Sequence, residues 1–254
     1  MPDLDPIVAR LRAAGCVFAE EEAAVLRSSA RDEAELIAFV AERETGVPLE
    51  HVVGWAEFCG LRVIVESGVF VPRPRTERLV ERAREFVRAG DVVVDACCGS
   101  GAVGLALATL EPGIRLIATD IDERAVAVAR RNLVGVGEVV VGDALDALPT
   151  AVLGSVALLA VIAPYVPTGD IPLLPHEARD FEPLLALDGG PDGLGVLARV
   201  VGDAPRWLAP GGVIITEVSE QQAPAAARLI RAAGLAAEID SDEESGSTLV
   251  LGRA

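Results

Sequence analysis

Hydrophobic positions in the first part of the chain recur at the spacing of an α-helix. Ile7 and Leu11 belong to one such group, Leu36 and Val40 belong to another, and charged residues lie between them. A glycine and a proline then interrupt the pattern. We therefore expect a small helical domain over residues 1–46.

The pattern changes to short runs of β-type residues in the next part of the chain. Residues 61–65 and 69–71 are such runs, and we expect them to form a hairpin-like connection. Pro72 and Pro74 mark a turn after the second run. These features predict a β-hairpin linker over residues 47–74.

From residue 75 onward, uninterrupted apolar runs alternate with helical patterns. Continuous apolar strands separated by helices are typical of a parallel sheet covered on both faces. The expected strands are 92–94, 116–118, 138–141, 156–162, 213–218, 235–239 and 248–251. The expected helices are 76–87, one from Ala102, one from Glu123, and 222–233. The last two strands follow each other across an acidic turn and are expected to pair antiparallel. Residues 75–254 thus predict an α/β domain with a seven-stranded sheet.

A glycine-containing turn links the first expected strand of this sheet to the helix after it. Glycine lets a ligand approach the backbone closely at the carboxyl end of such a strand. Residues 99–104 read as GxGxxG, which makes a dinucleotide one candidate ligand. By itself this pattern has low specificity.

Three aspartates stand at the ends of consecutive expected strands. An ionised carboxylate at Asp95 would repel the phosphates of a dinucleotide but can pair with an ammonium group. Asp120 is placed to accept hydrogen bonds from a ribose diol, and Asp143 is placed to contact an adenine amino group. Together they indicate an adenosine ligand with a positively charged tail. The alternative is that each aspartate only caps the following helix.

The net charge of −17 and the absence of lysine exclude several classes of function. A protein that docks broadly on nucleic acid or on anionic membranes needs a cationic surface, so we expect neither partner. Without lysine the chain has no Schiff-base lysine and no P-loop lysine. The arginines between residues 73 and 88 form a local basic cluster. We expect them to pair with glutamates on the same helix, with binding of an acidic partner as the alternative.

The four cysteines and two histidines form neither a disulfide framework nor a metal-ligand pattern, so we expect no metal site. His176 beside Glu177 is a candidate general base, and a surface histidine is the simpler interpretation. No apolar stretch approaches the ~18 residues of a membrane span, and the first residues do not form a secretory signal. A cytoplasmic location is therefore expected.

Residues 92–104 and the three aspartates resemble motif I and the following acidic motifs of the class I S-adenosylmethionine-dependent methyltransferases. The resemblance implies a Rossmann-like sheet and S-adenosylmethionine as the cofactor. The residues implied to bind it are Asp95, Cys97, Cys98, Gly99, Ser100, Gly101, Asp120, Ile121, Asp143 and Ala144. Cys97 replaces the first loop glycine of the family. We interpret Cys97 and Cys98 as small loop residues rather than a redox pair, because adjacent cysteines bridge only with strain.

Further segments over nearly the whole chain resemble the HemK-like protein glutamine N5-methyltransferases. These segments are 43–54, 58–61, 71–80, 163–167, 177–183 and 186–194. The resemblance implies a helical substrate-recognition domain, a hairpin linker, and a release factor as the protein partner. Arg73, Thr76, Glu77 and Glu182 match family positions implied to bind the substrate or lie near the cofactor, whereas Arg75 stands where the family usually has an acid.

The loop that holds the methyl acceptor departs from the family pattern. In the family it reads Asn-Pro-Pro-Tyr, and the Asn oxygen and a proline carbonyl accept the two hydrogens of the substrate amide. The corresponding catalytic positions here are Ile162, Ala163, Pro164 and Tyr165. Isoleucine has no acceptor atom, and one lost orienting hydrogen bond costs about 2 to 4 kcal/mol in the transition state. Methylation of a glutamine amide is therefore in question.

Three functions stay open from the sequence. The protein can methylate a small molecule through an amine, hydroxyl or thiol that needs no side-chain acceptor. It can methylate a release-factor glutamine if the backbone carbonyls of residues 162 and 163 suffice. It can also bind the cofactor without methyl transfer, or use the sulfonium for other chemistry.

Overall fold

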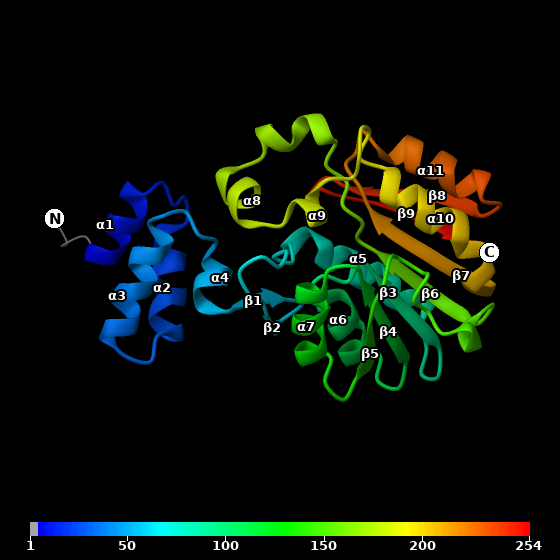
Figure 1. Ribbon diagram of the computed structural model, residues 1–254, viewed down its shortest axis with the longest axis horizontal. Helices are drawn as coiled ribbons and strands as arrows, with labels where there is room; N and C mark the ends of the chain where they lie inside the picture. The colour runs from blue at the N-terminus through cyan, green and yellow to red at the C-terminus, as the bar shows by residue number, and fades with distance from the viewer. Residues whose placement is uncertain (1–4) are drawn as a thin grey trace.

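Four helices form the N-terminal part of the computed structural model, which describes residues 5–254 (Figure 1). They are α1 (Pro6–Ala13), α2 (Ala19–Ser29), α3 (Glu33–Arg43) and α4 (Leu49–Val53). Asp5 and Asp32 cap α1 and α3, because each carboxylate accepts a hydrogen bond of 2.9 Å from a backbone N–H of the first turn. Leu11, Leu26 and Val40 are fully buried in a hydrophobic cluster between these helices. The helical spacing in the sequence is thus confirmed.

A two-stranded hairpin follows the helices. Strands β1 (Trp55–Phe58) and β2 (Leu61–Ile64) pair antiparallel. Cys59 and Gly60 form the turn between them with φ angles of 51° and 71°. Two-residue hairpin turns commonly need this left-handed backbone, because it matches the twist of the strands.

Residues 69–71 form no strand, so the expectation that they belong to the hairpin was wrong. The partner of residues 61–64 lies before them in the chain, not after them. The backbone N–H of Val71 donates instead to the carboxylate of Glu182, at 3.2 Å. Pro72 follows and cannot donate to a strand ladder, which leaves this segment extended but unpaired.

The rest of the chain is organised around a seven-stranded sheet, as expected. The strand order is β5-β4-β3-β6-β7-β9-β8. The strands are β3 (Val92–Ala96), β4 (Arg115–Asp120), β5 (Gly137–Val141), β6 (Val156–Val161), β7 (Leu208–Glu217), β8 (Ala236–Asp242) and β9 (Ser247–Arg253). Strands β3 to β7 are parallel, and β9 runs antiparallel to both of its neighbours. The sequence prediction of the α/β fold is therefore confirmed.

Helices cover both faces of this sheet (Figure 1). On β3, Val93 points into one core and Val94 into the other, as the alternation of side chains in a strand requires. The first core contains residues of α5 (Glu77–Ala83), α6 (Ala102–Leu110) and α7 (Glu123–Asn132). The second core contains residues of α10 (Gly195–Trp207) and α11 (Ala223–Ala232). Both cores meet at the central strands, which explains their uninterrupted apolar sequences.

The connection between β6 and β7 contains helices to which the sequence analysis assigned no position. Besides α10, these are η4 (Thr168–Leu173), α8 (His176–Phe181) and α9 (Leu184–Leu187). Pro175 and Pro183 stand directly before the first residues of α8 and α9, where a helix tolerates proline. Single turns also occur at η1 (Pro74–Thr76), η2 (Arg84–Phe86) and η3 (Thr150–Val152). Over residues 5–254, no helix combines the length and apolar character that a membrane crossing requires.

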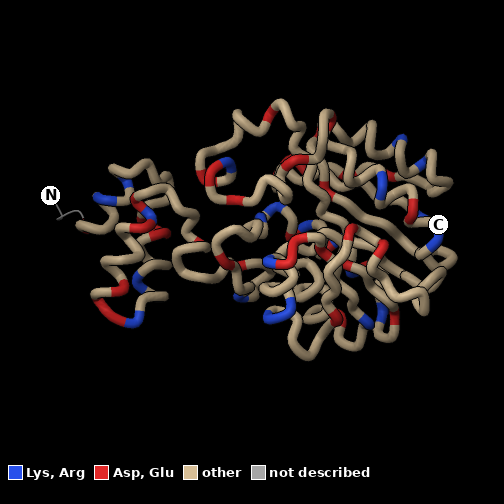
Figure 2. The backbone as a smooth tube through the Cα atoms, viewed as in Figure 1, with Lys and Arg blue, Asp and Glu red and all other residues tan. Residues whose placement is uncertain are grey.

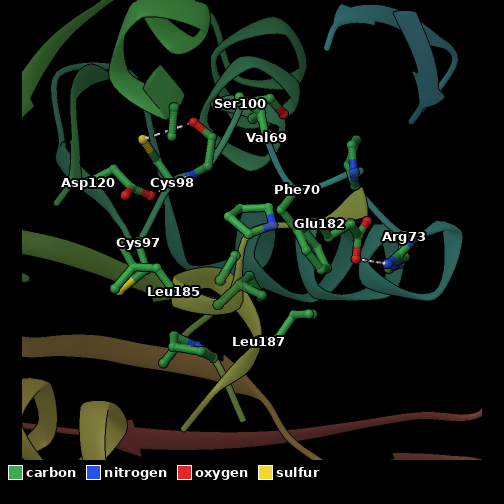
Figure 3. Close-up of a pocket in the computed structure, with 18 of the residues that line it drawn as sticks. Val69, Phe70, Arg73, Cys97, Cys98, Ser100, Asp120, Glu182, Leu185 and Leu187 are labelled. Carbon is green, nitrogen blue, oxygen red and sulfur yellow. Dashed lines mark hydrogen bonds and ion pairs between the residues drawn. The ribbon is translucent and has the colours of Figure 1, made fainter. Parts of the chain in front are cut away.

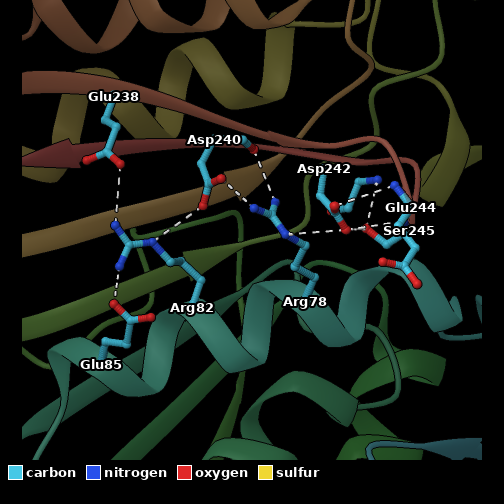
Figure 4. A network of polar contacts seen from close by, with 9 residues as sticks. Arg78, Arg82, Glu85, Glu238, Asp240, Asp242, Glu244 and Ser245 are labelled. Atoms are coloured by element: carbon cyan, nitrogen blue, oxygen red, sulfur yellow. Dashed lines mark hydrogen bonds and ion pairs between the residues drawn. The ribbon is translucent and has the colours of Figure 1, made fainter.

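The arginines of α5 pair mainly with the edge of the sheet. Arg78 donates to the carboxylate of Asp240 on β8, and Arg82 lies within 3.4 Å of both Asp240 and Glu238 (Figure 4). Within its own helical segment Arg82 pairs with Glu85. The expectation of pairing along the helix therefore holds for Arg82 and was wrong for Arg78. Over the whole fold, acidic and basic residues are interspersed (Figure 2).

A buried arginine joins the N-terminal helices to α8. Arg43 is 6% exposed, and its guanidinium donates to Glu22 of α2 and to Glu177 of α8, each at 2.6 Å. The same side chain donates to the backbone carbonyl of Val47 at 3.2 Å. One cation therefore neutralises two carboxylates that belong to different parts of the chain.

We predict that Arg43→Met lowers the free energy of unfolding by about 3 kcal/mol, because it leaves two carboxylates without a buried partner. Arg10→Met is the matched control. Arg10 pairs with Glu44 at the surface, and its loss should cost at most about 1 kcal/mol. Urea denaturation of both variants measures the difference. Equal losses would contradict the role given to Arg43.

Candidate functional site

A cavity of about 560 Å³ opens at the carboxyl edge of the parallel strands (Figure 3). Its walls come from the ends of β3, β4 and β6, from residues 69–76, and from residues 174–187. The expected cofactor-binding residues that line it are Asp95, Cys97, Cys98, Gly99, Ser100, Asp120, Ile121, Asp143 and Ala144. The expected acceptor-side residues that line it are Arg73, Thr76, Ile162, Ala163, Pro164, Tyr165 and Glu182. Gly101 and Glu77 lie outside this lining.

The turn after β3 has a left-handed backbone at several positions. Cys97, Gly99 and Gly101 have φ angles of 57°, 54° and 79°. For a residue with a side chain this conformation costs about 1–2 kcal/mol, so Cys97 is strained where glycine would not be. A Cβ atom added to Gly101 would lie 3.1 Å from Leu133 of the adjoining segment, whereas one added to Gly99 would meet no atom within 4 Å. Gly101 therefore serves packing, and Gly99 faces open space.

Two strand-end carboxylates hold this turn in place. Oδ2 of Asp95 accepts a hydrogen bond of 2.8 Å from the backbone N–H of Gly104 in the first turn of α6. Oδ2 of Asp120 accepts one of 2.8 Å from the backbone N–H of Gly99, and its Oδ1 accepts one of 2.9 Å from Asp122. Asp95 thus does cap the following helix α6, as the alternative interpretation expected. Asp120 does not cap α7, because the capping residue of that helix is Asp122. The same two carboxylates also line the cavity.

Burial changes the acidity of both carboxyl groups. Asp95 is 1% exposed, and loss of hydration raises its pKa to about 7. The hydrogen bond from Gly104 works in the opposite direction, and the nearby charge of Asp120 adds to the increase. Burial also raises the pKa of Asp120. A cationic group beside these residues would reverse the increases, because it stabilises the ionised carboxylates.

Asp143 is paired with an arginine that the sequence analysis did not consider. Nη1 and Nη2 of Arg199 in α10 donate to the two carboxylate oxygens of Asp143, at 2.5 and 3.0 Å. Arg199 also lines the cavity. The contact of Asp143 with an adenine stays a prediction. In that contact the adenine would share the carboxylate with the guanidinium of Arg199.

The loop thiols are poor nucleophiles. Burial raises the pKa of Cys97 to about 12, and it raises the pKa of Cys98 well above its usual value. The carboxylates of Asp95 and Asp120 add to both increases. Reactive cysteines need a stabilised thiolate, so both residues fit the role of small packing groups better than a redox role.

Tyr165 is held at both its backbone and its side chain. Its carbonyl oxygen accepts a hydrogen bond of 2.8 Å from Nε2 of Gln222. A Cβ atom on Gly193 would lie 2.2 Å from that same oxygen, so the close approach requires glycine there. Its phenol oxygen accepts a hydrogen bond from Arg75. Nε of Arg75 in turn donates to Oε1 of the buried Glu217, at 2.9 Å.

A second buried glutamate joins two segments over the cavity. Glu182 accepts hydrogen bonds from the backbone N–H of Val71 at 3.2 Å and from Arg73 at 2.5 Å (Figure 3). Burial raises the pKa of Glu182, and Arg73 opposes that increase. Glu77 has a different position, since its carboxylate accepts a hydrogen bond of 2.9 Å from the backbone N–H of Cys59 in the hairpin turn.

His176 lies outside the lining of the cavity. Its imidazole is exposed and contacts the carboxylate of Asp180 at 3.0 Å, one turn further along α8. This position agrees with the interpretation of His176 as a surface histidine. Its neighbour Glu177 lines the cavity, but the carboxylate of Glu177 is bonded to Arg43.

Sequence reasoning missed Arg199, Glu217 and Gln222. Glu217 is the last residue of β7. An acidic residue at the end of a strand is the same signal that identified the three aspartates, so the sequence could have indicated Glu217 as well. Arg199 belongs to an amphipathic helix that the sequence analysis did not assign. Gln222 contacts Tyr165 across 57 residues, and nothing local in the sequence indicates that contact.

The sheet order and the position of the cavity define a class I methyltransferase fold. A methyltransferase from Pyrococcus furiosus has the same fold with a TM-score of 0.58 at 16% identity, over 76% of this chain and 89% of that one. A ribosomal protein L11 methylase from Lactobacillus delbrueckii gives a TM-score of 0.51 at 15% identity, over 71% and 80%. The family model "Methyltransferase small domain" matches residues 61–154.

Sequence relatives narrow this class to one family. The release factor glutamine methyltransferase of Streptomyces coelicolor is 44% identical over 72% of this chain and 66% of its own length. That of Gloeobacter violaceus is 38% identical over 74% and 67%. The chain belongs to the HemK-like methyltransferase family. A further relative, the 4-amino-L-phenylalanine/4-methylamino-L-phenylalanine methyltransferase of Streptomyces pristinaespiralis, is 38% identical over 77% and 69%. The matched part thus spans about two thirds of the length of these relatives.

We predict that Asp95 makes stability depend on pH in the absence of ligand. Its pKa is about 7 in the folded protein and 3.8 as the ordinary value, so the folded state binds the proton more tightly. The contribution to stability is complete below about pH 4 and is lost as the pH rises through 7.

Asp95→Asn should therefore increase the free energy of unfolding by at least about 1 kcal/mol at pH 8 and change it little at pH 4. Asp170→Asn, at an exposed position in η4, is the control and should have no such effect. Urea denaturation at both pH values checks this. A gain for Asp95→Asn of the same size at both pH values would show that burial does not penalise the ionised carboxylate.

Proposed function

We propose that the protein transfers a methyl group from S-adenosylmethionine to an acceptor at Tyr165. One observation carries this proposal. The three strand-end aspartates and the turn at Gly99 line the same cavity as Ile162 and Tyr165. A cofactor bound at the aspartates would therefore have its reactive end open to the acceptor side.

The residues at the strand ends suit the charge and shape of this cofactor. Asp95 offers a buried carboxylate for the ammonium group, and that pairing would stabilise its ionised form. Gly99 presents bare backbone, because no atom lies within 4 Å of the position of a Cβ. Asp120 is proposed to bind the ribose, and Ile121, Asp143 and the other lining residues of the loop are proposed to bind the adenine and the methionine part.

S-adenosylmethionine, when bound, supplies a methyl group on a positively charged sulfur. The chain then has mainly to position the acceptor and exclude water, which needs few acid or base groups. Tyr165, fixed by Gln222 and Arg75, forms a rigid wall beside Ile162. Pro164 lies between them and stiffens the backbone.

The acceptor that this site suits best is a small molecule with an amine, hydroxyl or thiol. Ile162 lines the cavity with an apolar side chain where an amide substrate would need a hydrogen-bond acceptor. Unlike an amide nitrogen, such nucleophiles have a lone pair that is not delocalised into a carbonyl, so they do not need that acceptor. The proton that they lose on methylation passes to the medium. The relative from Streptomyces pristinaespiralis, whose name gives small aromatic amines as substrates, supports this choice.

A release-factor glutamine is the second candidate acceptor. Several relatives are named for this activity, at up to 44% identity. The backbone carbonyls of Ile162 and Ala163 could then replace the missing side-chain oxygen. We keep residues 1–46 as a substrate-recognition domain, 47–74 as a linker and 75–254 as the methyltransferase domain within this proposal. Pro48 and Glu50 of the linker line the cavity, which supports a role of this segment in acceptor selection.

Turnover with methyl-labelled S-adenosylmethionine tests these alternatives in one design. The enzyme is incubated with a release factor, with a protein-free pool of small metabolites, and without an acceptor. Label in the metabolite pool alone supports the small-molecule proposal, and label in the release factor alone supports the second candidate. Binding of the cofactor without transfer to either would overturn both and leave the cofactor-binding alternative.

We predict that Ile162→Asn raises the rate of methyl transfer to a release-factor glutamine by at least about tenfold, because it restores an acceptor for the amide hydrogens. Ile162→Ala is the control, since it also removes the isoleucine side chain but adds no oxygen. Initial rates with labelled cofactor measure the effect. An equal gain for alanine, or no gain for asparagine, would show that the missing acceptor does not limit this reaction.

A further inference from the structure

Two arginines line the acceptor side of the cavity, and each is held by a buried glutamate. Arg73 donates to Glu182 at 2.5 Å, and Arg75 donates to Glu217 at 2.9 Å. The side chains of the two glutamates are 1% and 3% exposed, whereas those of the arginines are 33% and 45% exposed. The glutamates therefore anchor the guanidinium groups from the protein side.

Arg75 is fixed in orientation but keeps hydrogen-bond donors free. Its Nε donates to Glu217, and its Nη2 donates to the phenol oxygen of Tyr165. Its guanidinium carbon lies 5.9 Å from the centre of the Tyr165 ring. No hydrogen bond from its Nη1 is found within residues 5–254, and a guanidinium has five N–H donors in all. Arg75 can thus donate to a bound molecule without moving.

The hydrogen-bonding groups beside Tyr165 are the opposite of those that an amide substrate requires. An amide has N–H hydrogens that need an acceptor, and the side chain at position 162 offers none. The polar group that the structure places beside Tyr165 is a donor, because Arg75 occupies that position. Ile162 and Arg75 line the same cavity, so both changes act on one ligand. The acceptor molecule should therefore present oxygen atoms with lone pairs here.

We propose that Arg75 is a specificity-determining residue that binds a carboxylate of a small methyl acceptor. This inference rests on the proposed function and specifies the substrate class for it. A carboxylate matches the planar fork of an arginine and forms strong charge-assisted hydrogen bonds with it. Arg73, two residues earlier, adds a second guanidinium on the same side of the cavity.

The other lining residues limit the remainder of this acceptor. Phe70, Leu185 and Leu187 add apolar side chains to the lining of the cavity (Figure 3). The carboxylates of Glu50 and Glu182 also line the cavity and would repel a second anionic group. A molecule with a single carboxylate on an apolar or aromatic body satisfies both conditions.

Matched carboxylate and amide probes test this inference in the presence of saturating S-adenosylhomocysteine. The probes are benzoate, phenylacetate and L-phenylalanine, each compared with its own primary amide by calorimetry. We expect at least one carboxylate to bind about tenfold or more tightly than its amide, as one charge-assisted pair predicts. Arg75→Gln should remove this preference. Arg84→Gln, which changes an exposed arginine paired with Glu111, should leave it intact.

The affinity for S-adenosylhomocysteine, measured for every variant, separates the possible failures. Unchanged affinity in Arg75→Gln shows that the fold and the cofactor side are intact. Two results would overturn this inference while the proposed function stands. In the first, S-adenosylhomocysteine binds but no carboxylate probe binds more tightly than its amide. In the second, the preference for the carboxylate survives in Arg75→Gln. If S-adenosylhomocysteine does not bind the unmodified protein, the proposed function fails and this inference fails with it.

Discussion

The carboxylates at the ends of β3 and β4 are the constraint on which the site depends. Asp95 fixes the start of α6 through Gly104, and Asp120 fixes the turn through Gly99. Burial raises the pKa of both groups, so their ionised forms are destabilised. Ionisation of these two carboxyl groups is therefore unfavourable in the unliganded protein, and a cationic ligand beside them would stabilise the ionised forms. The same two carboxylates thus hold the turn after β3 in place and are proposed to contact the cofactor.

On the acceptor side of the cavity, the buried carboxylates are paired with arginines. There Glu182 and Glu217 are buried, and each has an arginine partner that reaches the cavity. The rigid position of Tyr165 follows from the same contacts and from Gln222. The family resemblance alone implies an amide acceptor, but Ile162 and Arg75 change the hydrogen bonds that this side can make. Family membership and acceptor identity are thus separate questions for this chain.

The sequence was sufficient for the fold because the apolar strands and amphipathic helices have strong local patterns. The position of Asp95 and Asp120 at the cavity could also be predicted, since each lies at the carboxyl end of its strand, and their contact with a cofactor stays a prediction. The partner of Asp143 was not accessible, because Arg199 lies in a helix 56 residues away. The predicted hairpin was partly wrong because residues 69–71 pair with no strand, and the backbone N–H of Val71 donates to the side chain of Glu182 instead. Contacts between distant segments are set by packing and leave no local signal.

The central claim is that the cavity at the strand ends binds S-adenosylmethionine through these carboxylates. Calorimetric titration with S-adenosylhomocysteine tests it most directly, with Asp120→Asn as a comparison. The account predicts one binding site per chain, with a dissociation constant in the micromolar range of about 10⁻⁶–10⁻⁴ M that is at least about tenfold weaker in the variant. No detectable binding to the unmodified protein at millimolar ligand would contradict the account.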